Sequence, residues 1–262
     1  MRQHLHPIRA EGRATQELEE ALEAFFARDL IVDVIGWLKA GKEAQVFICE
    51  AHPATGKDLL AAKVYRPRLG RSFKKEVTYL EGRGDLMRGR ARASSTARAI
   101  ERRSRAGKAL LEDLWVRREH DILSKLWQAG VRVPQPRSLA ERALLMDYVG
   151  TEEAQAPRLQ DVTLTAEAAG AIRDEILSFI EVILSQDLVH GDLSPYNVLI
   201  HDGSPWIIDV PQAIEAHVHP DPFPLLQRDV TRITHHFARY GIEDDGEGRA
   251  ADMWHRYASG RL

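Results

Sequence analysis

Cysteine is nearly absent from this chain of 262 residues, which holds only Cys49. A single cysteine excludes an intrachain disulfide and a cysteine zinc site, and it is typical of proteins of the reducing cytoplasm. Long apolar runs are also lacking, because Glu181 interrupts the best candidate, ILSFIEVILS, short of the roughly 18 apolar residues of a membrane helix. The start MRQHLHPIRAEG has no apolar signal-peptide segment. We therefore expect a cytoplasmic protein with no membrane span.

An excess of charge of either sign is lacking too, since 36 basic side chains stand against 39 acidic ones and the net charge is −3. Nothing global indicates a nucleic-acid-binding protein. The exception is local: residues 83–108 hold nine Lys or Arg and two acids. We expect residues 66–110 to be a basic insertion, mainly a solvated loop with some helix. The alternative is an arm at 83–108 that contacts RNA, a ribosomal subunit or an acidic protein, and the two interpretations are compatible.

The spacing of apolar residues outlines the elements. Helical spacing in residues 18–30 predicts an amphipathic helix at the end of an N-terminal extension, residues 1–30. Three apolar runs with polar or glycine-containing breaks, DLIVDVIGWL, AQVFICEA and LLAAKVY, predict an antiparallel meander. A helical stripe at 115–126, a buried strand in RALLMDYVG and a long helix from about Thr165 follow. The pattern is that of an α+β protein.

The stretch NVLIHDGSPWIID, residues 197–209, contains two apolar runs around Asp-Gly-Ser, which predicts a β-hairpin. If the hairpin is centred on Gly203, Asn197 lies opposite Asp209, and directly opposed residues share a face of the ribbon. Two oxygen ligands completed by phosphate and water suit Mg²⁺. The alternative is a purely structural role, in which the two side chains cap backbone groups.

Asp192 favours the catalytic interpretation of this stretch. It lies in a loop five residues before Asn197, where a carboxylate can accept the proton of an attacking hydroxyl. The order H-x-D, four residues, then Asn resembles the catalytic loop of the protein-kinase-like fold. We expect His190 to be a packing and hydrogen-bonding residue.

Phosphoryl transfer also needs a cation for the nucleotide phosphates, and Lys63 ends an apolar strand. A single lysine on a strand is often only a surface residue. However, Glu119 lies on the apolar stripe of its helix, where a carboxylate without a partner would be very unfavourable. We expect Lys63 to be that partner, as in the lysine and glutamate pair of kinases.

Gly36, Gly41 and Lys42 have the spacing of a phosphate-binding P-loop, but Glu43 stands where that motif needs Ser or Thr. A strand-like run follows instead of a helix. We therefore expect Gly41, Lys42 and Glu43 to form a turn between two strands that covers the nucleotide.

Taken in order, AGKEAQVF, AAKVY, REHDILSKLWQAGVRVPQP, LLMDYVG, HGDLSPYNVLI and WIIDVPQA resemble the RIO family of atypical protein kinases, its first subfamily above all. The resemblance runs from about residue 28 to residue 237. It implies a bilobal protein-kinase-like fold with a small antiparallel-sheet N-lobe at 31–147 and a reduced, mostly helical C-lobe at 148–262. It also implies phosphorylation of serine or threonine with ATP and Mg²⁺, or Mn²⁺. In archaeal and eukaryotic members the partner is the maturing small ribosomal subunit.

The resemblance also implies roles for single residues. Lys63 and Glu119 would position phosphates, and Asp147 and Val149 would offer backbone groups to adenine. Asp192 would be the catalytic aspartate, while Asn197 and Asp209 would bind metal. The family's counterpart of Asp209 can accept the γ-phosphate, which implies an ATPase-like switch.

Some features depart from ordinary kinases or from the family. Val210-Pro211 replaces Phe-Gly, no A-P-E follows, and Gly191 replaces the arginine that senses a phosphorylated activation loop. Control by such a loop is therefore not expected. Ala40 and Pro211 differ from the residues common in the family at these positions, but the catalytic carboxylates are all present. Two alternatives stay open: a small-molecule phosphotransferase like aminoglycoside or choline kinases, and an assembly factor that uses nucleotide as a switch and binds RNA or the ribosome.

Overall fold

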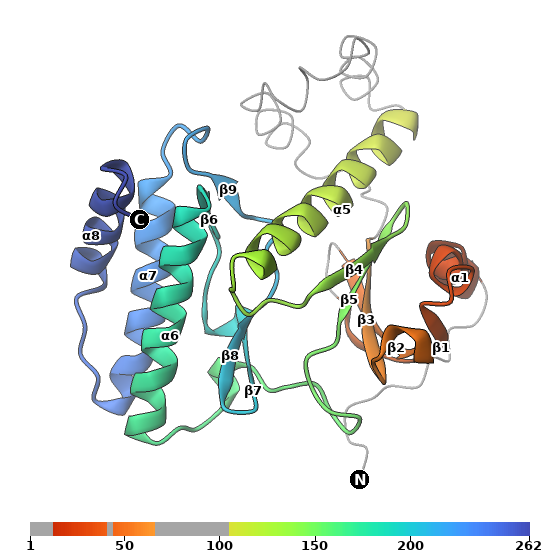
Figure 1. Ribbon diagram of the computed structural model, residues 1–262, viewed down its shortest axis with the longest axis horizontal. Helices are drawn as coiled ribbons and strands as arrows, with labels where there is room; N and C mark the ends of the chain where they lie inside the picture. The colour runs from red at the N-terminus through yellow and green to blue at the C-terminus, as the bar shows by residue number, and fades with distance from the viewer. Residues whose placement is uncertain (1–12, 41–43, 66–104) are drawn as a thin grey trace. The chain divides into compact units, whose positions relative to one another are not determined.

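The computed structural model describes residues 13–40, 44–65 and 105–262, and the chain divides into two compact units (Figure 1). The first unit takes Met1–His120 and Pro136–Tyr148, and the second takes Asp121–Gln135 and Val149–Leu262. The lobe boundary predicted at residue 147 lies close to the last junction, between Tyr148 and Val149. Residues 121–135, which lie within the predicted N-lobe, fall in the second unit. The lobe bounds themselves stay a prediction. Residues 66–104 of the predicted basic insertion lie outside the described residues.

The first unit contains a five-stranded antiparallel sheet in the order β1-β2-β3-β5-β4. Its strands are β1 (Ile31–Ala40), β2 (Ala44–Ala51), β3 (Leu59–Tyr65), β4 (Pro136–Leu139) and β5 (Ala143–Asp147), with a short 3₁₀ turn, η1 (Pro53–Thr55), between β2 and β3. The predicted meander of three strands is confirmed, because β1 pairs with β2 and β2 with β3.

The helix expected at the end of the N-terminal extension is α1 (Arg13–Phe26), which covers one face of this sheet. Leu22 and Phe25 are fully buried there, as expected from the apolar spacing. Strand β3 alternates between the two faces of the sheet. Leu60, Ala62 and Val64 join the core under α1, so Ala61, Lys63 and Tyr65 lie on the opposite face. All six are buried, and this alternation is what places Lys63 away from α1.

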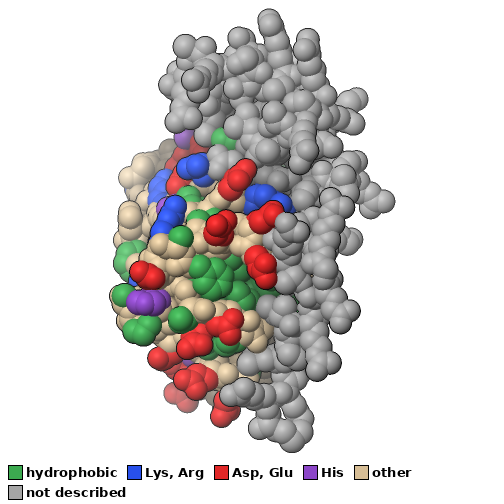
Figure 2. All heavy atoms as spheres, turned by 90° about the vertical axis from the view of Figure 1, so that its right-hand side faces the viewer, with side chains coloured by type: hydrophobic (Ala, Val, Ile, Leu, Met, Phe, Trp, Pro, Cys, Tyr) green, Lys and Arg blue, Asp and Glu red, His purple; other side chains and the backbone are tan. Residues whose placement is uncertain are grey.

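Acidic side chains are frequent on the described surface of the first unit. Figure 2 shows one face of the molecule, on which acidic side chains are grouped around apolar ones. Asp33 and Glu50 occupy paired positions of β1 and β2, which brings two like charges close together. The exposed carboxylates from α1 to β2 are those of Glu19, Glu20, Glu23, Asp29, Asp33 and Glu50.

The second unit is mostly helical. Helix α5 (Arg105–Gln128) crosses from the first unit into the second, which also contains α6 (Ala166–Ser185), α7 (Phe223–Phe237) and α8 (Gly246–Ala258). Helices α6, α7 and α8 lie side by side in Figure 1. Two short ribbons complete it, β6 (Leu188–Val189) with β9 (Ile214–Glu215), and β7 (Val198–His201) with β8 (Ser204–Ile207). Its 3₁₀ turns are η2 (Leu159–Asp161), η3 (Pro195–Asn197) and η4 (Ala238–Tyr240).

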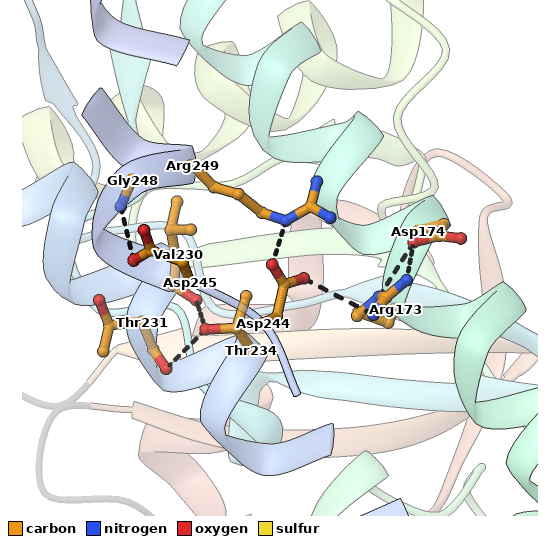
Figure 3. Close-up of polar contacts among 9 residues, drawn as sticks. All are labelled: Arg173, Asp174, Val230, Thr231, Thr234, Asp244, Asp245, Gly248 and Arg249. Carbon is orange, nitrogen blue, oxygen red and sulfur yellow. Dashed lines mark hydrogen bonds and ion pairs between the residues drawn. The ribbon is translucent and has the colours of Figure 1, made fainter. Parts of the chain in front are cut away.

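A polar cluster connects these helices (Figure 3). Asp244, whose side chain is buried, forms ion pairs with Arg249 of α8 and with Arg173 of α6, the latter at 3.6 Å. Asp245 caps α8 by accepting a hydrogen bond of 2.9 Å from the Gly248 N–H. Similarly, Thr165 caps α6 by accepting a bond from Ala168, which confirms the predicted start of that helix. The cluster fixes α8 and the loop before it onto α6.

The mixed fold class predicted from the sequence is confirmed: an antiparallel sheet comes first and a mainly helical part follows. Within the ranges that the structure describes, every helix falls short of the combined length and apolar character that crossing a bilayer requires.

Candidate active site

Lys63 and Glu119 form a buried ion pair in the first unit. The Lys63 Nζ atom lies 2.6 Å from Glu119 Oε1, and the two residues are 8% and 2% exposed. Strand β3 directs Lys63 away from the α1 core, and α5 directs Glu119 inward. The Nζ atom also lies 5.6 Å from the centre of the Tyr65 ring, a distance suited to a cation–π contact. The predicted pairing of a strand lysine with a helix glutamate is therefore present.

Asp147 ends β5, and its carboxylate is fully engaged. Arg137 binds it through two nitrogens, at 2.5 and 3.0 Å, and Lys57 lies at 3.2 Å. Only the backbone of Asp147 is therefore left to recognise a ligand, as the sequence-based hypothesis requires. Two residues later, in the second unit, the Val149 carbonyl accepts a hydrogen bond from the Ala156 N–H at 3.1 Å. The Val149 N–H is therefore the backbone group of this residue that we consider for ligand recognition.

The hairpin β7–β8 forms, but its predicted register is wrong by one residue. Val198 pairs with Ile207 and His201 with Ser204, so the turn consists of Asp202 and Gly203 alone. Both have positive φ values, 50° and 74°, which is the geometry of a two-residue turn whose twist matches that of the strands.

Asn197 consequently faces Ile208, whose N–H donates to the Asn197 carbonyl at 2.9 Å. Asp209 is the next residue and not the directly opposed one. Its φ is 64°, an unusual value for a residue with a side chain, and the chain turns there out of the ribbon. The Asn197 side-chain nitrogen donates to the Asp192 carbonyl at 2.9 Å, so the amide oxygen remains for a cation. Together with the exposed Asp209 carboxylate, this donor set fits a hard cation such as Mg²⁺.

Asp192 lies in the loop between β6 and η3, and its side chain is 54% exposed. One oxygen accepts a hydrogen bond from Arg232 of α7 at 3.0 Å. The neighbouring His190 is buried, and burial lowers its pKa although the Asp209 carboxylate opposes that shift. Its Nδ1 accepts a long hydrogen bond from the Asp192 N–H at 3.4 Å. These properties fit packing and not proton transfer.

Helix α7 holds this loop through residues that the sequence interpretation did not identify. Asp229, which is 1% exposed, accepts hydrogen bonds from the N–H groups of Gly191, at 2.7 Å, and Leu193, at 3.0 Å. Burial raises the Asp229 pKa to about 7, against the opposing effect of these two bonds. Arg228 donates to the Gly191 carbonyl. Gly191 itself has a φ of 79°, and a Cβ atom there would lie 3.0 Å from the Gln212 carbonyl oxygen.

A signal for Asp229 was present in the sequence. Leu226, Val230 and Ile233 form the apolar stripe of α7, and all three are buried. Asp229 lies on the same stripe, three residues after Leu226 and four before Ile233. A carboxylate in that position needs a partner, which is the argument that identified Glu119.

Gly41, Lys42 and Glu43 lie outside the described residues, so their expected turn stays a prediction. The flanking strands β1 and β2 pair up to Ala40 and Gln45, which is consistent with a short connection. Three predicted residues of the second unit, Asp192, Asn197 and Asp209, come from one loop and its adjoining ribbon.

Comparison with known proteins gives a consistent set of matches. The model of a family described as "RIO domain" matches residues 46–248. The chain is similar to the RIO-type serine/threonine-protein kinase Rio1 of Haloferax volcanii, with 33% identity over 212 residues, 81% of this chain and 66% of that protein. It is 31% identical over 221 residues to the serine/threonine-protein kinase RIO1 of Caenorhabditis elegans, 82% of this chain and 39% of that protein.

The serine/threonine-protein kinase RIO3 of Mus musculus is 27% identical over 224 residues, which cover 82% of this chain and 40% of that protein. The matched regions thus span about two thirds of the archaeal relative and about two fifths of the two animal relatives.

Proposed function

Because the chain belongs to the RIO domain family, we propose that it is an ATP- and Mg²⁺-dependent serine/threonine protein kinase. The observation that carries the proposal is the buried Lys63–Glu119 pair, with 2.6 Å between its charged atoms. Burying two charges costs desolvation free energy, which only a very favourable geometry can offset. Such a pair is therefore a candidate for a functional role. A lysine fixed by a helix glutamate is the arrangement that kinases use to hold nucleotide phosphates.

The remaining residues have complementary roles in this proposal. The backbones of Asp147 and Val149 recognise the adenine edge, and the turn at Gly41, Lys42 and Glu43 covers the phosphates. Asn197, through its amide oxygen, and Asp209, through its carboxylate, would hold Mg²⁺. The ion would supply positive charge that offsets the charge of the phosphates.

Asp192 acts on the acceptor side of the reaction. Its exposed carboxylate accepts the proton of the substrate hydroxyl while the oxygen of that hydroxyl bonds to the γ-phosphorus and the bond to ADP breaks. This role is supported by the bonds that hold the loop from Asp229, because a general base must be placed within hydrogen-bond distance of the proton.

Incubation of the full chain with γ-labelled ATP, Mg²⁺ and a cell lysate tests the proposal. We expect label on serine or threonine with the wild type and none with Asp192→Asn or Lys63→Met. Arg256→Gln, which removes an arginine paired with Glu181 and Asp252, is the matched control and should label like the wild type. A wild-type protein that neither binds ATP nor transfers phosphate would end the kinase hypothesis.

A second candidate activity is ATP hydrolysis through an aspartyl-phosphate on Asp209. Its exposed carboxylate, at the point where the chain leaves the ribbon with a φ of 64°, favours this candidate. A carboxylate oxygen would bond to the γ-phosphorus as ADP leaves, and water would then hydrolyse the acyl phosphate. Label that hydroxylamine removes, and that Asp209→Asn abolishes, supports the switch. Acid-stable label alone supports the protein kinase.

A partner contact is proposed for the basic residues 83–108. Support comes from their nine Lys or Arg, in contrast to the acidic described surface of the first unit. Binding to a small ribosomal subunit or RNA should weaken steeply with salt, because each released counterion contributes to the affinity. Deletion of 83–108 should abolish that binding. An unchanged affinity after deletion would remove this segment from the proposal.

The small-molecule phosphotransferase remains the alternative enzyme. It would be favoured by robust turnover of an amino-alcohol or an aminoglycoside in the absence of any protein phosphorylation. The same labelled ATP assay distinguishes the two classes when those compounds replace the lysate.

A further inference from the structure

Helix α7 presents three charged side chains to the loop that carries Asp192. Arg228, Asp229 and Arg232 occupy positions i, i+1 and i+4, which lie on one side of a helix. Arg228 and Asp229 bind backbone groups of Gly191 and Leu193, so they fix the path of the loop. Only Arg232 reaches a side chain of the loop, and that side chain is the proposed general base.

The Arg232–Asp192 contact is poorly suited to a stabilising role. The two side chains are 42% and 54% exposed, and their nitrogen and oxygen lie 3.0 Å apart. Exposed pairs of this kind contribute little to folding because water and salt screen them. Any role of the contact therefore concerns Asp192 and the groups that approach Asp192.

The loop itself supplies no cation. His190 to Asn197 reads HGDLSPYN, without Lys or Arg, and the side chain of His190 is buried. A negatively charged base and an incoming phosphoryl group repel each other unless a positive charge is near both. Arg232 places a positive charge beside this carboxylate, with its Nη1 atom 3.0 Å from Asp192 Oδ1.

From this arrangement we infer that Arg232 is a positioning residue for phosphoryl transfer. It orients the Asp192 carboxylate toward the acceptor and offsets its charge as the phosphoryl group approaches. The inference rests on the proposed kinase function. It makes α7, and not the loop, the source of the positive charge on the acceptor side.

The test compares kinetics of the full chain with Arg232→Gln and Arg232→Lys. Misplacing a catalytic group by about 1 Å costs on the order of 100-fold, so we expect kcat of Arg232→Gln to fall about 10- to 100-fold. The KM for ATP should stay within about twofold, because the interaction is made on the acceptor side. Arg232→Lys keeps the charge without the planar guanidinium and should restore part of kcat. Arg256→Gln is the control and should keep the wild-type kcat.

A double-variant comparison separates positioning from a general structural effect. If Arg232 acts through Asp192, then Arg232→Gln should change the residual rate of the Asp192→Asn protein by less than about twofold. Equal reductions in both backgrounds would overturn the inference, and so would an unchanged or raised kcat in Arg232→Gln. Absence of phosphoryl transfer by the wild type would instead end the proposed function, so the two failures are distinguishable.

Discussion

Two ion pairs, one in each unit, join the same kinds of chemical group in opposite surroundings. Lys63 and Glu119 lie 2.6 Å apart and are nearly excluded from water. Arg232 and Asp192 lie 3.0 Å apart with about half of each side chain exposed. Desolvation makes a lone charge in the first pair very unfavourable, so removal of either partner by itself should destabilise the fold. The second pair is free of that constraint, and its effect should be confined to the reaction.

The largest expected effect comes from breaking the buried pair. Glu119→Leu removes the counter-charge that the structure gives Lys63, and such a change typically costs about 3–5 kcal/mol of the free energy of unfolding. Lys63→Met with Glu119→Leu replaces both charges with apolar groups and should recover most of that stability. Urea unfolding followed by circular dichroism measures both.

The rate of phosphoryl transfer gives a second comparison of these variants with the wild type. The double variant should be stable but unable to transfer phosphate, because its apolar pair cannot hold the phosphates. A double variant as unstable as Glu119→Leu would contradict the claim that the pair is retained for function.

The exposed pair should show the opposite behaviour. Asp192→Asn removes the proposed general base, and general-base catalysis typically contributes about 10²- to 10⁴-fold to the rate. The free energy of unfolding should change by no more than about 0.5 kcal/mol, as at other surface positions. Asp252→Asn, which replaces another exposed aspartate paired with an arginine, is the control for both measurements. A large loss of stability in Asp192→Asn would show that the exposed pair, like the buried one, contributes substantially to the free energy of unfolding.

The sequence predicted the buried pair from one strong pattern. The 3.6-residue period of α5 placed Glu119 on a buried face, where a carboxylate needs a cation, and Lys63 at the end of an apolar strand was the available partner. The same reasoning would have found Asp229. Its partners, however, are backbone N–H groups of a loop, and residue types do not reveal which backbone groups bind a carboxylate. Asp229 could thus be suspected from the sequence, whereas its partners needed the structure.

The hairpin illustrates a different limit. Its two strands and its turn were predictable from DG between apolar runs, but the number of turn residues was not. Because a shift of one residue changes every cross-strand partner, Asn197 pairs with Ile208 and not with Asp209. The order of Asp192, Asn197 and Asp209 survives the shift, since it depends on the path of the chain and not on register.

Asp229 differs from Glu119, the other buried carboxylate discussed above, because backbone N–H groups bind it in place of a buried cation. Its pKa is raised to about 7, so between about pH 4 and pH 7 the folded state binds a proton that the unfolded state has lost. Stability from this group is therefore complete below pH 4 and is lost as pH rises through 7.

The shift corresponds to a contribution on the order of a few kcal/mol. Asp229→Asn should remove this contribution, so the difference in free energy of unfolding between wild type and variant should change between pH 5 and pH 8 in the direction that disfavours the wild type at pH 8. Parallel curves would contradict the raised pKa. The variant should also lose activity, because an amide cannot accept hydrogen bonds from both Gly191 and Leu193 through separate oxygens.

The smallest expected effect is the contribution of the exposed pair to folding. A cycle of Asp192→Asn, Arg232→Gln and the double variant should give a coupling free energy of at most about 1 kcal/mol in unfolding. That coupling should shrink further in about 1 M NaCl, where charges are screened within about 3 Å. The buried pair of Lys63 and Glu119, measured in the same way, should keep its coupling at high salt because water and ions do not reach it. Equal salt sensitivity of the two cycles would contradict the proposed difference between the pairs, because salt should screen a buried pair much less than an exposed one.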